Sequence, residues 1–503
     1  FYDYTFDAFL KYERVFNDVH DVKVLLGTSV FKTTGRFEDI LTSNASGSNL
    51  NNVIIENPVL NGNGLEIFRN NNKGSAQFFD SRLLSYFTRI QYAYDSKYLF
   101  SAVLRRDGSS KFGPNEKFGF FPTASVGWIA SEEDFLKESE VLSFLKFRAS
   151  YGIVGNDRIG DFRFTSLLNG EAQYVFNNEL VQGLAAGPVA NPDIKWEEQK
   201  PLDIGVDLEL FNSINITADY FKKTTDDLLV SAQTSGIIGV AAPGSSVPVI
   251  NAGTVVNEGF EFVIGYKNMV SEDFNFNVNY NFTKLNNEVT FVGNSTGVIE
   301  GGSFGVGQES PSRMEAGFPI GYFYGYQTNG IFHPDDRTYI GDPIADITMG
   351  LNLSFNYKNF DFNAYAFASI GNEIVRNYER NLPLTNRPTY YLDRWTGPGT
   401  SDSFPRVTTG ATQNTLFSDF YVEDGSFLRL QSVQLGYSLG ETFLEKLKFD
   451  KLRFYVSASN LFTLTKYRGY DPTTSNGAPI GGGIDQGFYP NPKTFLLGMN
   501  VNF

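Results

Sequence analysis

The feature that most constrains the fold is a strict alternation of apolar and polar residues, repeated in many segments along the chain. In the clearest segment, apolar side chains from Phe274 to Phe282 alternate with the four asparagines from Asn275 to Asn281. The same alternation runs through 202–210, 347–355 and 452–459. Successive side chains of a β-strand point to opposite faces, so this pattern predicts strands with one apolar face. We therefore expect an all-β chain.

The expected strand lengths and connections favour a membrane barrel over a soluble sandwich. We count about fifteen strands of about nine residues or more, which is the length that a tilted membrane strand needs. Short connections such as 95–97 and 211–213 alternate with long ones such as 155–195 and 290–346. Outer-membrane barrels have short periplasmic turns and long external loops. A sandwich also alternates apolar and polar residues, but nothing in it requires this order of connections.

Composition excludes several other classes of protein. The 503 residues include no cysteine, which rules out disulfides and thiolate metal sites. The formal charge of −15 argues against nucleic acid as a partner, because phosphates are bound by basic surfaces. No apolar run approaches the ~18 residues of a membrane helix. No linker or shift in composition divides the chain, so we expect residues 1–503 to belong to one domain.

Several motifs resemble those of the SusC/RagA family of TonB-dependent outer-membrane transporters. They include RRDGSSKFG (105–113), SVGWIASEEDFL (125–136), YFYGYQTNGIF (322–332), EDGSFLRL (423–430), SNLF (459–462) and GYDP (469–472). The motifs follow the family order along nearly the whole chain. The apolar positions of 495–503, which end on Phe503, also resemble the terminal strand signal of outer-membrane barrels. The motif positions that we single out are Arg105, Arg106, Asp107, Gly108, Asp424, Gly425, Arg429, Asn460 and Asp471.

The resemblance implies a location and an architecture. Plugged transporter barrels have 22 strands, so residues 1–503 would be the C-terminal portion of such a barrel in the cell outer membrane. The chain starts at Phe1 rather than at a methionine, and we expect the first strands and the plug to lie in an upstream segment. Counting strands back from the C-terminus places residue 1 at the external end of its strand. An open sheet would expose an unpaired edge to lipid, so the missing strands are needed.

The resemblance also implies a function and partners. We expect active import of an oligosaccharide or a peptide, with a SusD-like surface lipoprotein as partner and with TonB acting through the plug. Further expected partners are the N-terminal barrel and plug fragment, the lipid bilayer and lipopolysaccharide. The alternative is a SusC-like barrel that serves as a structural subunit of a larger outer-membrane assembly. A plug with a TonB-contacting segment would favour transport.

Catalysis, cofactors and metals are not expected. The two histidines, His20 and His333, have no acid and nucleophile beside them in the sequence, so a hydrolase triad is not indicated. Relatives commonly carry an acidic loop that resembles a calcium site after the 322–332 motif. This chain has only the segment 333–337 there, without the regularly spaced acids of a calcium loop.

Candidate ligand-binding residues lie in the expected long loops and on the polar strand face. The loop aromatics that would stack on sugars or receive apolar side chains are Tyr174, Phe176, Tyr390, Tyr391, Trp395, Phe488 and Tyr489. The alternative is that they form an interfacial girdle or pack within the loops. The Asn-rich segment 44–63 is a further candidate. Polar positions expected inside the barrel include Asn275, Asn277, Asp203, Asp207 and Arg453. A helix is predicted over Glu132–Glu140, with Ser131 as its N-cap.

Overall fold

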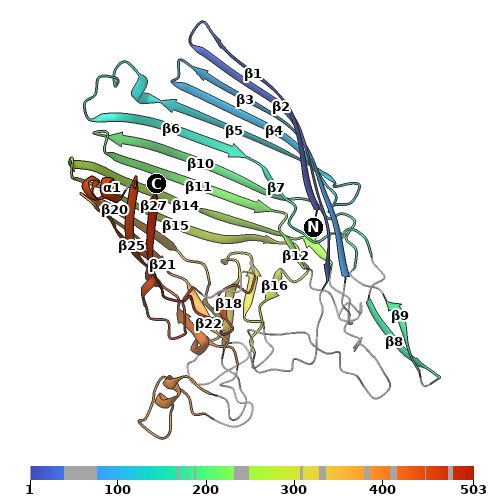
Figure 1. Cartoon of the computed structure of the whole chain (residues 1–503). Helices are drawn as coiled ribbons and strands as arrows, with labels where there is room; N and C mark the ends of the chain where they lie inside the picture. The colour runs from blue at the N-terminus through green and yellow to red at the C-terminus, as the bar shows by residue number, and fades with distance from the viewer. Residues whose placement is uncertain are drawn as a thin grey trace.

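One large antiparallel sheet makes up most of the molecule (Figure 1). The computed structural model describes residues 2–38, 76–161, 163–166, 170–177, 179–185, 189–231, 248–305, 310–327, 336–378, 386–407, 416–447, 449–473 and 480–503. The segment 44–63 and His333 lie outside these residues. The sheet has sixteen strands within the described ranges, and all except β7 lie on one continuous path. That path therefore contains fifteen strands, which agrees with the sequence-based count.

The sixteen strands of this sheet form the wall of the molecule. They are β1 (Tyr2–Phe16), β2 (His20–Glu38), β3 (Ala76–Tyr94), β4 (Tyr98–Ser109), β5 (Phe118–Ile129), β6 (Leu142–Gly152), β7 (Val154–Asn156), β10 (Glu197–Leu210), β11 (Ile214–Asp226), β14 (Gly253–Ser271), β15 (Phe274–Val292), β20 (Ile347–Tyr357), β21 (Phe360–Ile370), β24 (Phe427–Ser438), β25 (Lys451–Thr465) and β27 (Thr494–Asn502). Each neighbouring pair is antiparallel, and β7 pairs with β10 beside β6.

The register keeps apolar residues in rows across the sheet. Phe276 of β15 pairs with Phe355 of β20, which pairs with Phe362 of β21. One residue along, Asn277 pairs with Ser354. Because side chains alternate between the faces, the sheet has one apolar face and one polar face, as the alternation predicts.

Short turns join the strands at one end of the sheet and long loops join them at the other (Figure 1). The predicted turns 95–97 and 211–213 are confirmed with these bounds. Asp95, Ser96 and Asn212 adopt left-handed φ values of 50 to 55°, and polar residues tolerate this conformation in tight turns. Residue 2 lies at the loop end and the C-terminus at the turn end, which agrees with the predicted direction of the first strand.

The helix predicted over Glu132–Glu140 is wrong. A 3₁₀ turn, η1 (Ala130–Glu132), is followed by non-helical turns, and the Ser131 side chain makes no cap. The Glu133 carboxylate instead accepts hydrogen bonds from Tyr98 Oη at 2.6 Å and Trp128 Nε1 at 3.1 Å, which holds the segment against the wall. A short helix that was not predicted, α1 (Glu441–Leu447), joins β24 to β25. In the described ranges, no helix has both the length and the apolar character needed to cross a membrane.

The two edge strands are not joined to each other. Within the described residues, β1 pairs only with β2, and β27 pairs only with β25. All the side chains of β1 are exposed, including apolar ones on both faces such as Phe9 and Leu10. The sheet of this chain is therefore open, with one unpaired backbone edge at β1 and another at β27.

Four smaller sheets lie in the long loops. Their strands are β8 (Gly170–Phe176) with β9 (Glu179–Ala185), β12 (Leu229–Ser231) with β13 (Val249–Asn251), β16 (Val298–Gly301) to β19 (Arg337–Gly341) through β17 (Ser312–Glu315) and β18 (Tyr322–Tyr326), and β22 (Glu373–Arg376) between β23 (Val422–Asp424) and β26 (Ile484–Asp485). Short 3₁₀ turns, η4 (Thr389–Asp393) and η6 (Asp419–Tyr421), lie in the loop before β23. These elements were not predicted from the sequence.

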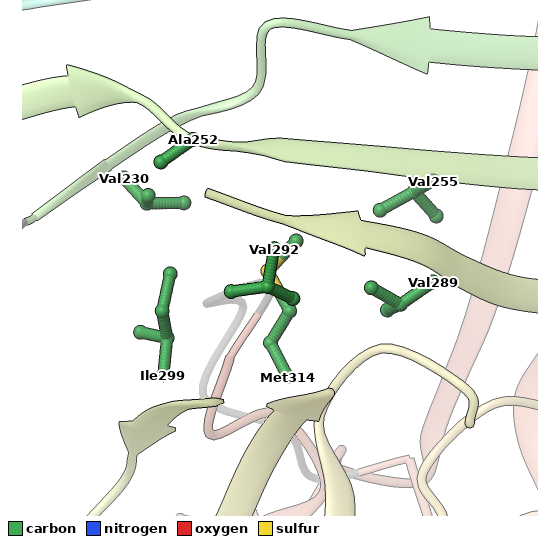
Figure 2. Close-up of a cluster of buried hydrophobic side chains, with 7 residues drawn as sticks. All are labelled: Val230, Ala252, Val255, Val289, Val292, Ile299 and Met314. Atoms are coloured by element: carbon green, nitrogen blue, oxygen red, sulfur yellow. The ribbon is translucent and has the colours of Figure 1, made fainter. Parts of the chain in front are cut away.

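The buried hydrophobic clusters lie where the loops pack against the strand ends. Figure 2 shows one of them, which contains Val230, Ala252, Val255, Val289, Val292, Ile299 and Met314. Val255 of β14 and Val289 of β15 are paired and belong to the polar-face alternation of their strands. The loops therefore fold over the external end of the polar face. Burying each valine, isoleucine or methionine side chain of this kind contributes about 1.5–3 kcal/mol, so these clusters stabilise the loop layer.

Candidate functional site

The polar face of the sheet carries paired charges and hydrogen-bonded amides. Arg148 of β6 forms ion pairs with Asp203 at 2.7 Å and with Asp207 at 3.3 Å. Arg453 pairs with Asp361 and also donates to Gln434 at 2.8 Å. These contacts place Asp203, Asp207 and Arg453 on one polar surface, where the alternation predicts them.

Asparagines extend the same polar surface. Asn275 accepts a hydrogen bond from Asn356 Nδ2 at 2.8 Å, and Asn277 accepts one from Asn279 Nδ2 at 3.0 Å. A depression of about 370 Å³ lies on the polar side near Arg148, where Ser101, Ser125 and Gly127 leave room beneath longer side chains. The surface is thus hydrophilic, and the charges of Arg148 and Arg453 on it are locally compensated.

Two long loops are tied together by a buried ion-pair cluster. The Arg376 side chain is 0% exposed and its Nη1 lies 2.6 Å from Glu423 Oε1. Arg468, from the loop after β25, reaches the same carboxylate oxygen at 2.8 Å. Val375 also pairs with Ile484 in the small β22–β23–β26 sheet. The loops that precede β24 and β27 are therefore held as one unit.

The charge of Glu423 is stabilised by this cluster. Burial alone would raise the pKa of its carboxyl. Hydrogen bonds from the backbone and side chain of Arg468, together with the positive charge of Arg376, outweigh burial and hold the pKa below its ordinary value. The cluster is therefore ionised at neutral pH.

Two predicted motif positions, Arg429 and Asp471, form a second buried pair. Arg429 Nη2 lies 2.6 Å from Asp471 Oδ1, and both side chains are buried. Asp471 also accepts hydrogen bonds from the backbone N–H groups of Thr473 at 2.9 Å and Asn491 at 3.0 Å. Burial would raise the pKa of Asp471, but these bonds and Arg429 lower it to about 2. The pair fastens the last long loop to the wall.

The other motif positions near the C-terminus shape the backbone. A Cβ at Gly425 would collide with the side chain of Asn372. Asp424 is exposed and accepts the backbone N–H of Ser426 at 2.9 Å. Asn460 has a left-handed φ of 52° where the β24–β25 register shifts, and its amide donates to the Pro492 carbonyl at 3.1 Å. These residues support the loops structurally.

The RRDG motif at the end of β4 also has a structural role. Arg105 donates two hydrogen bonds to Asp107, at 3.0 and 3.1 Å. The Arg106 guanidinium lies 4.4 Å from the centre of the Phe118 ring, and that ring occupies the space where a Cβ at Gly108 would stand. The motif thus packs the external ends of β4 and β5 together.

The predicted aromatic candidates occupy several places and do not form one site. Tyr390 and Tyr391 stack with ring centres 5.4 Å apart, and the Arg376 and Arg468 guanidinium groups lie 5.1 and 5.0 Å from the Tyr390 ring. Trp395 is half-buried in the same loop and its backbone N–H donates to Phe404.

The remaining aromatic candidates are exposed. Tyr174 and Phe176 lie on the separate β8–β9 hairpin, with 73% and 62% of their surfaces exposed. Phe488 and Tyr489 lie beyond β26, and Tyr489 is 90% exposed. Only the Tyr390–Tyr391 pair adjoins the ion-pair cluster.

Sequence reasoning missed the residues that join the loops. Arg376 and Arg468 belong to none of the motifs identified in the sequence. Glu423 is the first residue of the EDGSFLRL motif, but no role was predicted for it. Tyr467 Oη donates to the buried carboxylate of Asp485 at 2.6 Å, and burial raises the pKa of Tyr467 well above its usual value. The EDGSFLRL motif was the only sequence feature that indicated a role for the residues that join these loops.

No group of three or more His, Cys, Asp or Glu side chains is arranged to hold a metal ion in the described part of the chain. His20 shares a hydrogen bond with Tyr92 Oη at 2.9 Å. The absence of a metal or cofactor site stays a prediction from the sequence.

Comparison with known proteins identifies the family. The sequence model described as "TonB dependent receptor-like, beta-barrel" matches residues 2–461. The chain belongs to this family. TonB-dependent receptor P3 of Formosa agariphila is 33% identical over 472 residues, which are 85% of this chain and 46% of that protein. TonB-dependent receptor SusC of Bacteroides thetaiotaomicron is 31% identical over 458 residues, which are 84% of this chain and 44% of that protein.

Solved structures agree on the fold. The structure of the RagAB peptide transporter matches with a TM-score of 0.82 at 22% identity and covers 100% of this chain and 55% of that chain. The predicted SusC/RagA resemblance and outer-membrane location are confirmed. The chain spans about half the length of the curated relatives that it matches. Outer-membrane barrels turn apolar side chains to lipid, so the apolar face of the sheet is the lipid face and the polar face is the lumen face.

Proposed function

We propose that this chain forms the wall and external loops of a TonB-dependent importer of oligosaccharides or peptides. Its partners are a SusD-like surface lipoprotein and TonB, which acts through a plug segment outside the described sheet. Family membership supports import, and RagAB, which has the same fold, is a peptide transporter. As the wall of a transporter, the chain would take no part in bond making or breaking.

One observation supports this proposal above the others. The long loops fold over the external end of the lumen face, and the Arg376–Glu423–Arg468 cluster holds the two that precede β24 and β27 together. An ordered loop layer above a polar lumen is suited to receive a ligand and direct it inward. The stacked Tyr390 and Tyr391 rings lie beside this cluster, and flat aromatic faces pack well on sugar rings and on apolar peptide side chains.

The lumen wall is suited to passage rather than to tight binding. Its strongest charges, including Arg148 and Arg453, are paired with neighbouring carboxylates on the same face. A ligand that moves past these residues meets charges that are already paired with their neighbours. Conduction requires binding that is weak enough to allow release.

The test is mass spectrometry of the complete protein extracted gently from its own outer membrane. Peptide mapping of the associated chains is expected to find a plug-bearing segment and a SusD-like lipoprotein in equal amounts. Small-molecule analysis of the same sample is expected to find bound oligosaccharides or peptides. If the sample contains assembly or secretion factors and no plug-bearing segment, the import proposal is wrong and the barrel is a structural subunit.

A further inference from the structure

An apolar groove lies on the lipid face of the wall, close to the external loops. It has a volume of about 810 Å³ and runs over β20, β21, β24 and β25. The small side chains of Ala366 and Ala368 form its floor. Met349 of β20 pairs with Ala368, and Leu428 of β24 pairs with the same residue from the other side. The groove is thus a line of small residues between two walls of large ones.

The depth of the groove follows from the sequence of β21. On its lipid face this strand places two phenylalanines, then Ala364, Ala366 and Ala368, and then Ile370. Ala368 is 7% exposed, whereas Leu464, on the far side of Leu428, is 60% exposed. From Ala364 to Ile370 the strand advances ~20 Å at ~3.3 Å per residue.

The two ends of the groove differ in chemistry. On the turn side, the stacked rings of Phe355 and Phe362, 5.7 Å apart, stand beyond the last alanine. On the loop side, the groove is bordered by Asp424, Ser426 and Lys466. Lys466 is exposed and has no carboxylate within ion-pair distance in the described part of the chain. The Asp424 carboxylate is bonded to the Ser426 N–H.

We propose that this groove binds an acyl chain of lipid A, the phosphorylated glycolipid of the outer leaflet, with a phosphate on Lys466. Three observations select this occupant. The groove opens to lipid because it lies on the lipid face, and its loop end reaches the outer leaflet. Lys466 stands at that end without an ion pair in the described residues, and its charge also acts on the neighbouring Asp424 carboxylate. A methylene chain fills a narrow apolar groove without leaving a polar group buried, and a lysine binds a phosphate as a point charge.

The first test fills the groove. Ala366→Phe places a ring on its floor, and Ala102→Phe places the same ring on the lipid face of β4, where Ala102 pairs with Ile90 and Ala124. The complete protein is purified from outer membranes, and native mass spectrometry counts the lipid A molecules retained per barrel. We expect Ala366→Phe to retain several-fold less lipid A than the wild type, and Ala102→Phe to retain the wild-type amount.

The second test concerns the phosphate. The wild type, Lys466→Gln and Lys466→Arg are each titrated in nanodiscs with lipid A, with lipid A lacking phosphates and with phosphatidylethanolamine. We expect Lys466→Gln to weaken binding of phosphorylated lipid A several-fold and Lys466→Arg to preserve it. Binding of the dephosphorylated form should not change in either variant.

Three outcomes would overturn the proposal. Equal retention by Ala366→Phe and Ala102→Phe would mean that the groove holds only bulk lipid. Equal binding of phosphatidylethanolamine and lipid A would remove the specificity, and a second protein copy released by Ala366→Phe would make the groove a protein interface. The heat-dependent gel mobility of each variant shows that its barrel has folded, so loss of lipid is not mistaken for loss of structure.

Discussion

Arg429 and Asp471 show how two residues far apart in the sequence fix one loop. They are 42 positions apart, and their ion pair is buried between the wall and the last long loop. Their membership of family motifs was predicted from the sequence, but their partnership was not. Nothing in the alternation of a strand indicates which loop carboxylate its arginine will meet.

Replacing Arg429 with methionine should release the last loop. The variant keeps apolar volume but leaves Asp471 buried without its cation, and breaking a buried pair costs about 3–5 kcal/mol. Hydrogen exchange measured by mass spectrometry should become faster in 466–493 while exchange in the wall stays unchanged. Arg82→Met is the matched control, since Arg82 pairs with Asp80 at the surface. Unchanged exchange in Arg429→Met would contradict the role of the pair.

The same pair predicts how the loop responds to acid. The pKa of Asp471 is about 2 in the folded protein, against about 3.9 in an unfolded chain. A lowered carboxyl pKa contributes stability that is complete above the unfolded pKa and is lost as pH falls toward the folded pKa. Pepsin cleavage within 466–493 should therefore rise between about pH 4 and pH 2. In Asp471→Asn the contribution of this residue should be absent, and a wild-type pH response in that variant would argue against it.

Gly425 is required for close packing rather than for an unusual φ. An added Cβ would meet Asn372, so Gly425→Ala should separate the loop before β24 from the end of β21. Limited proteolysis is expected to cut 371–426 several-fold faster than in the wild type. Gly397→Ala is the control in the same loop, because no atom lies within 4 Å of the Cβ it would add. Equal cutting of the two variants would show that the contact is unimportant.

Among the elements, the β8–β9 hairpin stands apart from the wall. Its two strands form a sheet of their own, and Tyr174 and Phe176 are exposed on it. Figure 1 shows it extending away from the other loops. Its contribution to the stability of the barrel should therefore be small.

Replacing residues 170–185 with a short Gly–Ser linker should leave the barrel folded and reduce capture of a partner or ligand. The heat-dependent gel mobility and the thermal midpoint of the wall should match the wild type. Recovery of the associated lipoprotein and bound small molecules should fall several-fold, because the exposed aromatics are lost. A lower thermal midpoint would instead show that the hairpin supports the wall.

The wall strands were predictable and the loop strands were not, for a physical reason. Phe276, Asn277 and their neighbours alternate between apolar and polar residues, because one face of a wall strand contacts lipid and the other faces the lumen. Val375 and Ile484 pair in the loop layer across more than a hundred residues, and their short strands carry no such period. The candidate aromatics were likewise chosen by type, and only Tyr390 and Tyr391 adjoin the loop cluster.

At the scale of the whole molecule, the open edges at β1 and β27 limit what this chain does alone. An unpaired strand edge in lipid leaves backbone groups without hydrogen bonds, at a cost of several kcal/mol for each group. We expect both edges to pair with further strands in the membrane. The placement of residues 1–503 as the C-terminal portion of one barrel stays a prediction.

Expressed by itself, the chain should fail to give the heat-dependent gel mobility of a folded barrel. Co-expression with the remaining strands should restore it, because both edges then find partners. The chain has no native cysteine, so single cysteines placed on β1 and β27 report directly on closure. A disulfide between them in the membrane would show that this sheet closes on itself and would contradict the expectation.

The position of the hydrophobic clusters divides the molecule between two solvents. The wall has lipid on its apolar face and needs no protein core there, whereas the clusters around Val289, Phe417 and Trp196 lie in the loop layer. Urea weakens apolar association in water but leaves the backbone hydrogen bonds of a wall in lipid largely protected. Moderate urea should thus unfold the loop layer first and leave a folded barrel wall whose external opening is no longer covered by loops.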